Sequence, residues 1–265
     1  MALTQIIVLA IVQGITEFLP ISSSGHLVLV PNMFGWADQG MAFDVAMHFG
    51  SLIAVLIYFR SDIIALLQGT SQVLTFNVKS FESRLALAIG LGTIPAAIVG
   101  LMLGDWIGEN LRSPKVIAGT LAAYAVLMLL VDHFGKKTRD LKSIGIKDAV
   151  LIGLAQALAL VPGTSRSGIT ITAGLALGFS RTEAARFSFL LAVPVILLAT
   201  AYELTILAGS EATVAWGQLA FGAMVAAIVA YLSIEFFMRF VSRVGLLPFA
   251  LYRIALAAII LYALA

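Results

Sequence analysis

Six long apolar runs constrain the fold of this chain more than any other feature. A helix of about 20 apolar residues is long enough to cross the hydrocarbon core of a bilayer. The chain is 61% hydrophobic and 11% charged, whereas soluble domains carry about 25% charged residues. We therefore expect an all-α polytopic membrane protein, with one integral domain over residues 1–265. The runs are 42–59, 85–104, 115–132, 187–208, 214–238 and 246–264.

Two further apolar segments are too short to cross alone and end in similar polar motifs. Polar backbone at membrane depth is tolerated only where protein or a cavity surrounds it, so each motif predicts the tip of a re-entrant hairpin. The shift that aligns Gln13 with Gln156 also aligns Ser22 with Ser165 and Ser24 with Ser167. The motifs are Gln13-Gly-Ile-Thr-Glu-Phe-Leu-Pro-Ile-Ser-Ser-Ser-Gly-His26 and Gln156-Ala-Leu-Ala-Leu-Val-Pro-Gly-Thr-Ser-Arg-Ser-Gly-Ile-Thr170.

The two motifs divide the chain into halves of the same design. Each half, about 1–134 and 147–265, holds one hairpin and three spans, with a basic connector over about 135–146. Because three is odd, repeated halves must lie upside down relative to each other, which is the inverted-repeat arrangement of many membrane proteins. The alternative is a chance match in a chain rich in Ala, Leu, Gly and Ser.

The distribution of Lys and Arg predicts orientation. Twelve of them fall on the side opposite the N-terminus and two on its own side, which makes the first side cytoplasmic and places both termini outside. The net charge of +2 therefore reflects topology and does not indicate nucleic-acid binding. The twelve are Arg60, Lys79, Arg84, Lys136, Lys137, Arg139, Lys142, Lys147, Arg181, Arg186, Arg239 and Arg243, and the two are Arg112 and Lys115.

The second motif has the features of a phosphate site. Arg166 follows Pro-Gly, where a half-helix is expected to begin. A helix start offers unpaired N–H groups, and a guanidinium adds bidentate donors for phosphate oxygens. The alternative is that Arg166 pairs with Glu17 only to make both groups buriable. We expect further contacts to substrate from Gln13, Ser22, Ser24, Ser165, Ser167 and Thr170.

The first motif predicts reactive groups. Ser23 and His26 are three residues apart, so on a helix they share a face and the imidazole can accept the serine proton. Glu17 is expected to carry protons, orient His26 or bind a metal. Ser22 and Ser24, which follow a proline, are the best candidates for helix N-caps.

Taken together, the two motifs resemble those of bacterial undecaprenyl-diphosphate phosphatases of the bacitracin-resistance type, the BacA family. The likeness rests on Glu17 with Pro20-Ile-Ser-Ser-Ser-Gly-His26 and on Pro162-Gly-Thr-Ser-Arg-Ser-Gly-Ile-Thr170, and it extends to Phe187–Pro194 and Pro248–Arg253. It implies hydrolysis of a C55 polyprenyl diphosphate to the monophosphate, which recycles the lipid carrier for cell-wall glycans. Ser23 then matches the nucleophile, His26 the base, Glu17 the essential acid and Arg166 the phosphate-binding arginine.

The resemblance also implies a divalent cation, Mg²⁺ or Ca²⁺, and a site open to the periplasmic side of the bacterial inner membrane. Glu17 is the expected metal ligand. The family pattern Glu/Gln-x-x-x-Glu reads here from Gln13 to Glu17, which leaves one carboxylate and weakens a dicarboxylate site.

Alternative functions remain at this point. An inverted-repeat transporter or flippase of an anionic polyprenyl lipid would need Arg166 but no Ser/His pair, and a structural subunit would need neither. The sequence does not decide the oligomeric state, and a homodimer is one arrangement that it leaves open. Asp44 and His48 are interpreted as a structural contact or an outer mouth. No role is predicted for Glu203, Glu235 or Arg253.

Overall fold

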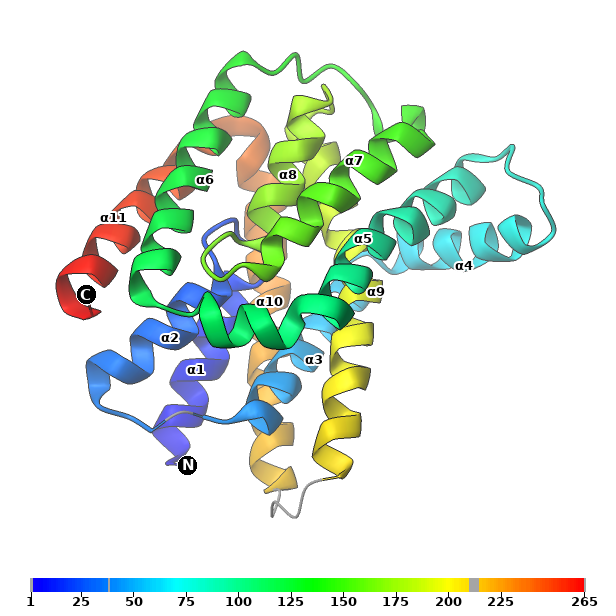
Figure 1. Cartoon of the computed structure of the whole chain (residues 1–265). Coiled ribbons are helices and arrows are strands. Elements are labelled where there is room, and N and C mark those ends of the chain that lie inside the picture. Colours follow the sequence, from blue (N-terminus) through cyan, green and yellow to red (C-terminus); the bar gives the residue numbers. More distant parts are fainter. Residues whose placement is uncertain (1, 38, 210–214, 265) are drawn as a thin grey trace.

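The computed structural model describes residues 2–37, 39–209 and 215–264, and helices dominate these ranges (Figure 1). No strand forms within them, so the all-α prediction is confirmed. The helices are α1 Leu3–Thr16, α2 Ser23–Phe34, α3 Met41–Tyr58, α4 Arg60–Leu74, α5 Phe81–Asn110, α6 Pro114–Phe134, η1 Leu141–Ser143, α7 Ile146–Ala157, η2 Leu158–Leu160, α8 Arg166–Ala176, α9 Arg181–Ala208, α10 Trp216–Val244 and α11 Leu247–Leu264.

Four helices, α5, α6, α9 and α10, are long and apolar enough to cross a bilayer as single segments. Helices α3 and α4 pass the same test together but are bent by 88°. Helix α11 is apolar but shorter. The multi-pass membrane class is therefore confirmed, although of the six predicted spans only four meet the length test as single helices. Position 214, where one predicted span begins, lies outside the described residues.

Helix α4 was not predicted, because its polar residues interrupt the apolar pattern that marks a span. It begins directly after the bend at Phe59, packs along α5 and exposes Ile64 and Leu67. Arg186 on α9 holds its first turn through an ion pair with Asp62.

A polar break between two helices occurs at each predicted hairpin, and the two breaks have the same local geometry. That these hairpins re-enter a membrane stays a prediction. Helix α1 leads to α2, and α7 with η2 leads to α8. Ser22 and Ser165 are the N-caps of α2 and α8, with φ of 75° and 70°, and their hydroxyls accept hydrogen bonds from the N–H groups of Gly25 and Gly168. The predicted cap at Ser22 is confirmed. The orientation of the two halves relative to a membrane stays a prediction.

Glycines let the first limb of each hairpin approach a long helix closely. A Cβ atom on Gly14 of α1 would lie 2.8 Å from the carbonyl oxygen of Ala226 in α10. One on Gly153 of α7 would lie 2.7 Å from the carbonyl oxygen of Gly92 in α5. Such backbone contact is how small residues pack membrane helices. The hairpin tips are thereby held in the middle of the molecule.

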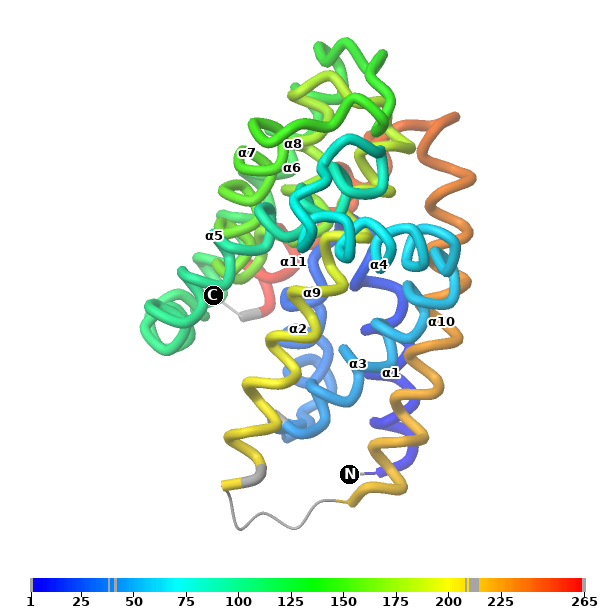
Figure 2. Tube along the Cα trace, turned by 90° about the vertical axis from the view of Figure 1, so that its right-hand side faces the viewer, coloured from blue at the N-terminus to red at the C-terminus, as the bar shows by residue number. Residues whose placement is uncertain are grey.

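Charged pairs gather at the connector end, which lies opposite the N-terminus in both views (Figures 1 and 2). Arg139 of the connector makes two hydrogen bonds to Asp148 of α7, at 2.9 and 2.8 Å. Arg181 of α9 binds Asp132 of α6 at 2.6 and 3.1 Å. These pairs fix the connector and the helix ends against each other.

Candidate active site

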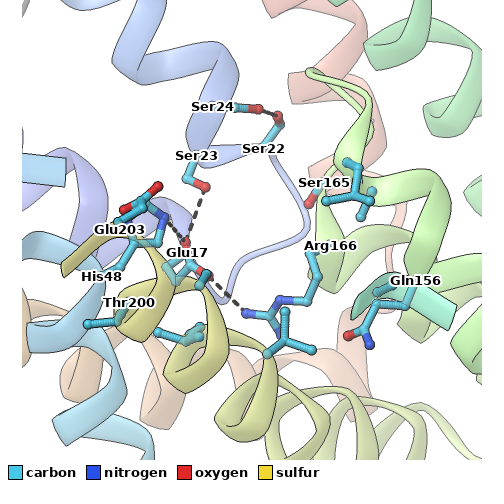
Figure 3. Close-up of a pocket in the computed structure, with 16 residues that line it drawn as sticks. Glu17, Ser22, Ser23, Ser24, His48, Gln156, Ser165, Arg166, Thr200 and Glu203 are labelled. Carbon is cyan, nitrogen blue, oxygen red and sulfur yellow. Dashed lines mark hydrogen bonds and ion pairs between the residues drawn. The ribbon is translucent and has the colours of Figure 1, made fainter. Parts of the chain in front are cut away.

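A pocket of about 230 Å³ lies where the two hairpin tips meet (Figure 3). Its polar walls come from both breaks and from α3, α7 and α9. Ser24 accepts a hydrogen bond from the N–H of Gly163, and Ser167 donates one to the carbonyl of Leu19, so the two breaks touch directly. The polar lining residues are Glu17, Ser22, Ser23, Ser24, His48, Gln156, Ser165, Arg166, Thr200 and Glu203.

The carboxylate of Glu17 is the centre of this pocket. Glu17 follows the last turn of α1 and is only 8% exposed. Its Oε1 accepts a hydrogen bond from Arg166 at 3.0 Å, and its Oε2 accepts one from Gln13 at 2.9 Å and one from Ser23 at 3.2 Å. His48 Nε2 lies 3.6 Å from the same Oε2. Buried charge is costly unless it is paired and hydrogen-bonded, and these four groups meet that need.

Arg166 is the first residue of α8, where its side chain reaches across to the first hairpin. It donates to Glu17 and, at 3.1 Å, to the carbonyl of Ser188. Arg166 and Glu17 therefore do form the pair that is the alternative explanation for a buried arginine at this position. A guanidinium has five N–H donors. Two of them make these bonds, and the other three make no hydrogen bond to protein among the described residues.

Ser23 and His26 do not form the predicted pair. The hydroxyl of Ser23 donates to Glu17. His26 Nδ1 lies 2.8 Å from the carbonyl oxygen of Ser22, and Nε2 lies 2.6 Å from the hydroxyl of Tyr252. Because a carbonyl only accepts, Nδ1 carries the proton and Nε2 accepts from the tyrosine. Both imidazole nitrogens are thus engaged away from Ser23, and His26 does not line the pocket.

The remaining predicted residues fall into two groups. Ser22, Ser24 and Ser165 line the pocket. The pocket lining does not include Gln13, Ser167 or Thr170, which contact residues that line it or that hold those residues in place. Gln13 holds Glu17, and Thr170 lies 2.6 Å from the Ser188 hydroxyl and donates to the carbonyl of Arg166, which steadies the start of α8.

Sequence reasoning missed the place of His48. The predicted structural contact with Asp44 is present, but the sequence did not predict that His48 also stands against Glu17 inside the pocket. Its Nδ1 contacts the backbone carbonyl of Asp44 at 2.8 Å. The available signal was an ionisable residue inside an apolar run, which marks a functional site by default.

Arg253, for which no role was predicted, joins the two breaks from behind. It is 1% exposed, and within the part of the chain that the structure describes its guanidinium donates to backbone carbonyls only. Those carbonyls belong to Pro20 of the first break at 3.3 Å, to Gly163 and Thr164 of the second at 3.2 and 2.9 Å, and to Leu121 of α6 at 3.3 Å. One cation therefore fixes both tips.

The described residues do not form a protein-only cation site. They contain no group of three or more His, Cys, Asp or Glu side chains that could hold a metal ion. Both oxygens of Glu17, the expected ligand, accept hydrogen bonds from protein donors. Cations such as Mg²⁺ need several oxygen ligands, and one engaged carboxylate does not provide them.

Comparison with known proteins places the whole chain in one group. The family model described as bacitracin resistance protein BacA matches residues 6–259. A protein of Nitrosococcus oceani named undecaprenyl-diphosphatase is 51% identical, with 97% of each chain covered. Proteins of the same name from Thioalkalivibrio sulfidiphilus and Alcanivorax borkumensis are 51% and 50% identical, with 99% and 98% of each chain covered.

Proposed function

The chain belongs to the bacitracin resistance protein BacA family, and we propose that its pocket around Glu17 hydrolyses undecaprenyl diphosphate to undecaprenyl phosphate and phosphate. The activity follows from the relatives, which carry the name of this enzyme over nearly the full length. The observation that supports the pocket as its site is the Glu17 carboxylate. It accepts a hydrogen bond from the Ser23 hydroxyl at 3.2 Å and another from Arg166 at 3.0 Å. The product is the lipid carrier for cell-wall glycans.

We assign the nucleophile to Ser23 and its activation to Glu17. The Ser23 proton passes to Glu17 Oε2 as Oγ attacks the terminal phosphorus in line with the leaving oxygen. The bond between that phosphorus and the bridging oxygen breaks, and undecaprenyl phosphate leaves with the electron pair. Water then attacks the serine phosphate and releases inorganic phosphate.

Arg166 and the starts of α2 and α8 stabilise the charge in this scheme. The three free donors of Arg166 can bind the equatorial oxygens of the transferring phosphoryl group. Ser23 and Arg166 are the first residues of their helices, so the N–H groups of both first turns lie beside the pocket. Helix N-termini favour phosphate through these unpaired donors and their dipoles.

The prenyl tail has an apolar path away from the pocket. A second cavity of about 260 Å³, lined by residues such as Phe49, Leu204 and Ala220, lies between α3, α9 and α10. Thr200 of α9 lines both cavities. We place the first isoprene units of the substrate in this cavity, with the rest of the tail in lipid.

The cation stays a prediction of the family resemblance, and no step above depends on it. Phosphate release measured with and without a chelator decides whether Mg²⁺ or Ca²⁺ is required. We further propose an inner-membrane location with both termini periplasmic and the pocket open to that side, while a homodimer stays untested. A single cysteine at position 138, in a chain that has none, should resist labelling from outside intact cells. Labelling there from outside would overturn this orientation.

Phosphate release from undecaprenyl diphosphate by the purified protein tests the activity itself. Wild type should release phosphate and Ser23→Ala should not, and a radiolabelled terminal phosphate should transiently label Ser23. His133→Gln, an exposed change at the end of α6, serves as the matched control and should keep the wild-type rate. A wild type that releases no phosphate would refute the function, and a Ser23→Ala variant as fast as wild type would refute the nucleophile.

A further inference from the structure

We propose that Thr200 binds the phosphate group that stays on the lipid, and so fixes how a prenyl diphosphate lies across the two cavities. The inference deepens the proposed function and rests on it. It starts from the observation that Thr200 of α9 lines both the polar pocket and the apolar cavity. In a prenyl diphosphate the charged part meets the apolar part at the phosphate next to the prenyl chain, so that phosphate belongs at the border of the two cavities.

This border runs along one face of α9. Residues three or four apart on a helix share a face. Ile196, four residues before Thr200, and Glu203, three residues after it, line the pocket. Leu204 and Leu207 continue the face, and they line the apolar cavity. Thr200 therefore stands where the wall of α9 changes from the pocket that holds charged groups to the cavity that holds apolar ones.

The hydroxyl of Thr200 makes no hydrogen bond to protein within the described ranges of the chain, although the residue is only 7% exposed. A threonine inside a helix can donate to the carbonyl four residues back. Thr93, Thr120 and Thr170 do so, at 2.7, 3.0 and 2.7 Å. A buried polar group without a partner is costly. The unpaired hydroxyl in the wall of the pocket therefore points to a ligand that pairs with it.

Thr200 also provides the side-chain donor that α9 brings to the pocket. A hydroxyl can donate to a phosphate oxygen, whereas an ionised carboxylate only accepts. Among the described residues of α9 that line the pocket, Thr200 alone has a hydroxyl, an amide or a cationic group. The others are Val195, Ile196, Ala199 and Glu203.

The terminal phosphate has its own donors on the hairpin breaks. In the proposed reaction it lies at Ser23 and Arg166, which both contact the carboxylate of Glu17, while Thr200 belongs to a different wall of the pocket (Figure 3). With the terminal phosphate at the breaks and the prenyl chain in the apolar cavity, the phosphate between them lies beside Thr200. The hydroxyl then stabilises the lipid phosphate as it takes the electron pair of the broken P–O bond, because a donor placed where charge develops lowers the barrier.

The alternative is that the Thr200 hydroxyl binds only water and never contacts the substrate. Thr200→Val separates the two, because valine has nearly the same shape but no hydroxyl. Thr200→Ala removes the hydroxyl in a second way, and Thr200→Ser keeps it. Thr205→Val is the matched control on the same helix. Thr205 is exposed, and its hydroxyl donates to the carbonyl of Tyr202 at 2.6 Å.

Three probes report on the three parts of the proposed site, and their binding to the purified protein is measured by calorimetry. The first is a farnesyl bisphosphonate, in which a methylene group replaces the oxygen between the phosphorus atoms and prevents hydrolysis. Inorganic phosphate tests the donors at the breaks alone, and farnesol tests the apolar cavity alone. Thr200→Val and Thr200→Ala should each raise the Kd of the bisphosphonate about 10- to 150-fold, the effect of one lost hydrogen bond to a charged group.

The same two variants should bind inorganic phosphate and farnesol as wild type does. Thr200→Ser and Thr205→Val should keep the wild-type Kd for all three probes. Arg166→Lys should weaken inorganic phosphate and the bisphosphonate but not farnesol, and Ala220→Phe should weaken farnesol and the bisphosphonate but not inorganic phosphate. Each part of the site thus has its own pattern of losses.

The proposal is overturned if Thr200→Val and Thr200→Ala bind the bisphosphonate as tightly as wild type. It is also overturned if they weaken all three probes alike, or if Thr200→Ser is as weak as Thr200→Val. These measurements need no turnover. A wild type that shows the expected binding pattern but releases no phosphate from undecaprenyl diphosphate would refute the proposed activity and support the site for the lipid phosphate.

Discussion

Replacement of Arg253 tests whether one buried cation holds the two hairpin tips in register. Arg253→Met keeps the length of the side chain but removes all four hydrogen bonds to the carbonyls of Pro20, Leu121, Gly163 and Thr164. A hydrogen bond from a charged donor contributes about 1.5–3 kcal/mol. We do not expect the variant to lose the sum of four such contributions, because burial of the arginine is itself costly and some of the carbonyls find new donors. A buried carbonyl left without a donor costs about 1–3 kcal/mol, so we expect a net loss of roughly 3–5 kcal/mol when Arg253 is removed.

For a chain of this length, 1 kcal/mol shifts the unfolding midpoint by about 2–4 °C. Arg253→Met should therefore lower the thermal midpoint of the detergent-solubilised protein by roughly 6–20 °C. In the molecules that stay folded at low temperature, kcat should fall about 10²-fold, since a misplacement of about 1 Å in reacting groups has that effect. KM should change less, because Arg253 does not line the pocket.

Two further variants make the result specific. Arg253→Lys retains three donors on a single atom, so it reaches fewer of the carbonyls and should be intermediate in both measurements. Arg239→Met is the control. The Arg239 side chain is 80% exposed and pairs with Glu235 on the same helix, and an exposed pair of this kind is worth less than about 1 kcal/mol. If Arg253→Met matches Arg239→Met in both midpoint and kcat, the proposed link between the tips is wrong.

Three other substitutions separate the roles of the pocket residues. Arg166→Lys should lose one charge-assisted hydrogen bond to phosphate, about 1.5–3 kcal/mol, and so lower kcat/KM about 10- to 150-fold; an unchanged kcat/KM would contradict the phosphate role. His26→Gln should lower stability by about 1–2 kcal/mol without moving the pH profile of kcat, whereas a shifted profile would restore His26 as a base. Ala220→Phe should fill the apolar cavity, and if it excludes two methylene-sized groups of the tail at about 0.8 kcal/mol each, KM rises about tenfold. Ala123→Phe, an exposed change on α6, should leave KM unaltered, and equal effects of the two would argue against the tail site.

The sequence was sufficient for the helices and for the hairpin breaks because those depend on local chemistry. Short apolar limbs that end in Pro, Gly and Ser cannot continue across a bilayer. A serine directly before a helix supplies an N-cap, as Ser22 and Ser165 do. The same reasoning does not predict helix α4, because a polar helix beside a bend has no apolar run to mark it.

The partners within the pocket could not be predicted, because they come from helices that are distant in sequence. A spacing of three places Ser23 and His26 on one face of a helix, but it does not fix which neighbours occupy that face. Tyr252 of α11 engages His26, and Glu17 engages Ser23. His48 meets Glu17 only because α3 packs against α1. The spacing of residues along a helix determines which side chains share a face, and the packing of distant helices determines which partners those side chains contact.

In the proposed reaction, the two hairpins contribute groups from positions that the shift of the two motifs aligns. Ser23 is the first residue of α2, and Arg166 is the first residue of α8. The shift that superimposes the two motifs places one on the other. Each extends from its helix start to a different oxygen of the same carboxylate, at 3.2 and 3.0 Å. In the proposed reaction, the position that carries the nucleophile in the first motif therefore carries the phosphate-binding group in the second.

The second motif has no carboxylate at the position that the same shift aligns with Glu17. The position equivalent to Glu17 is Leu160, and the one equivalent to His48 is the fully buried Leu191. A second carboxylate at Leu160 would compete with the first for Arg166 and would repel the diphosphate. In the proposed reaction, the single acid between the two helix starts gives Ser23 the role of nucleophile and Arg166 that of anion binder. The proposed division of roles thus arises from the few positions at which the two motifs differ.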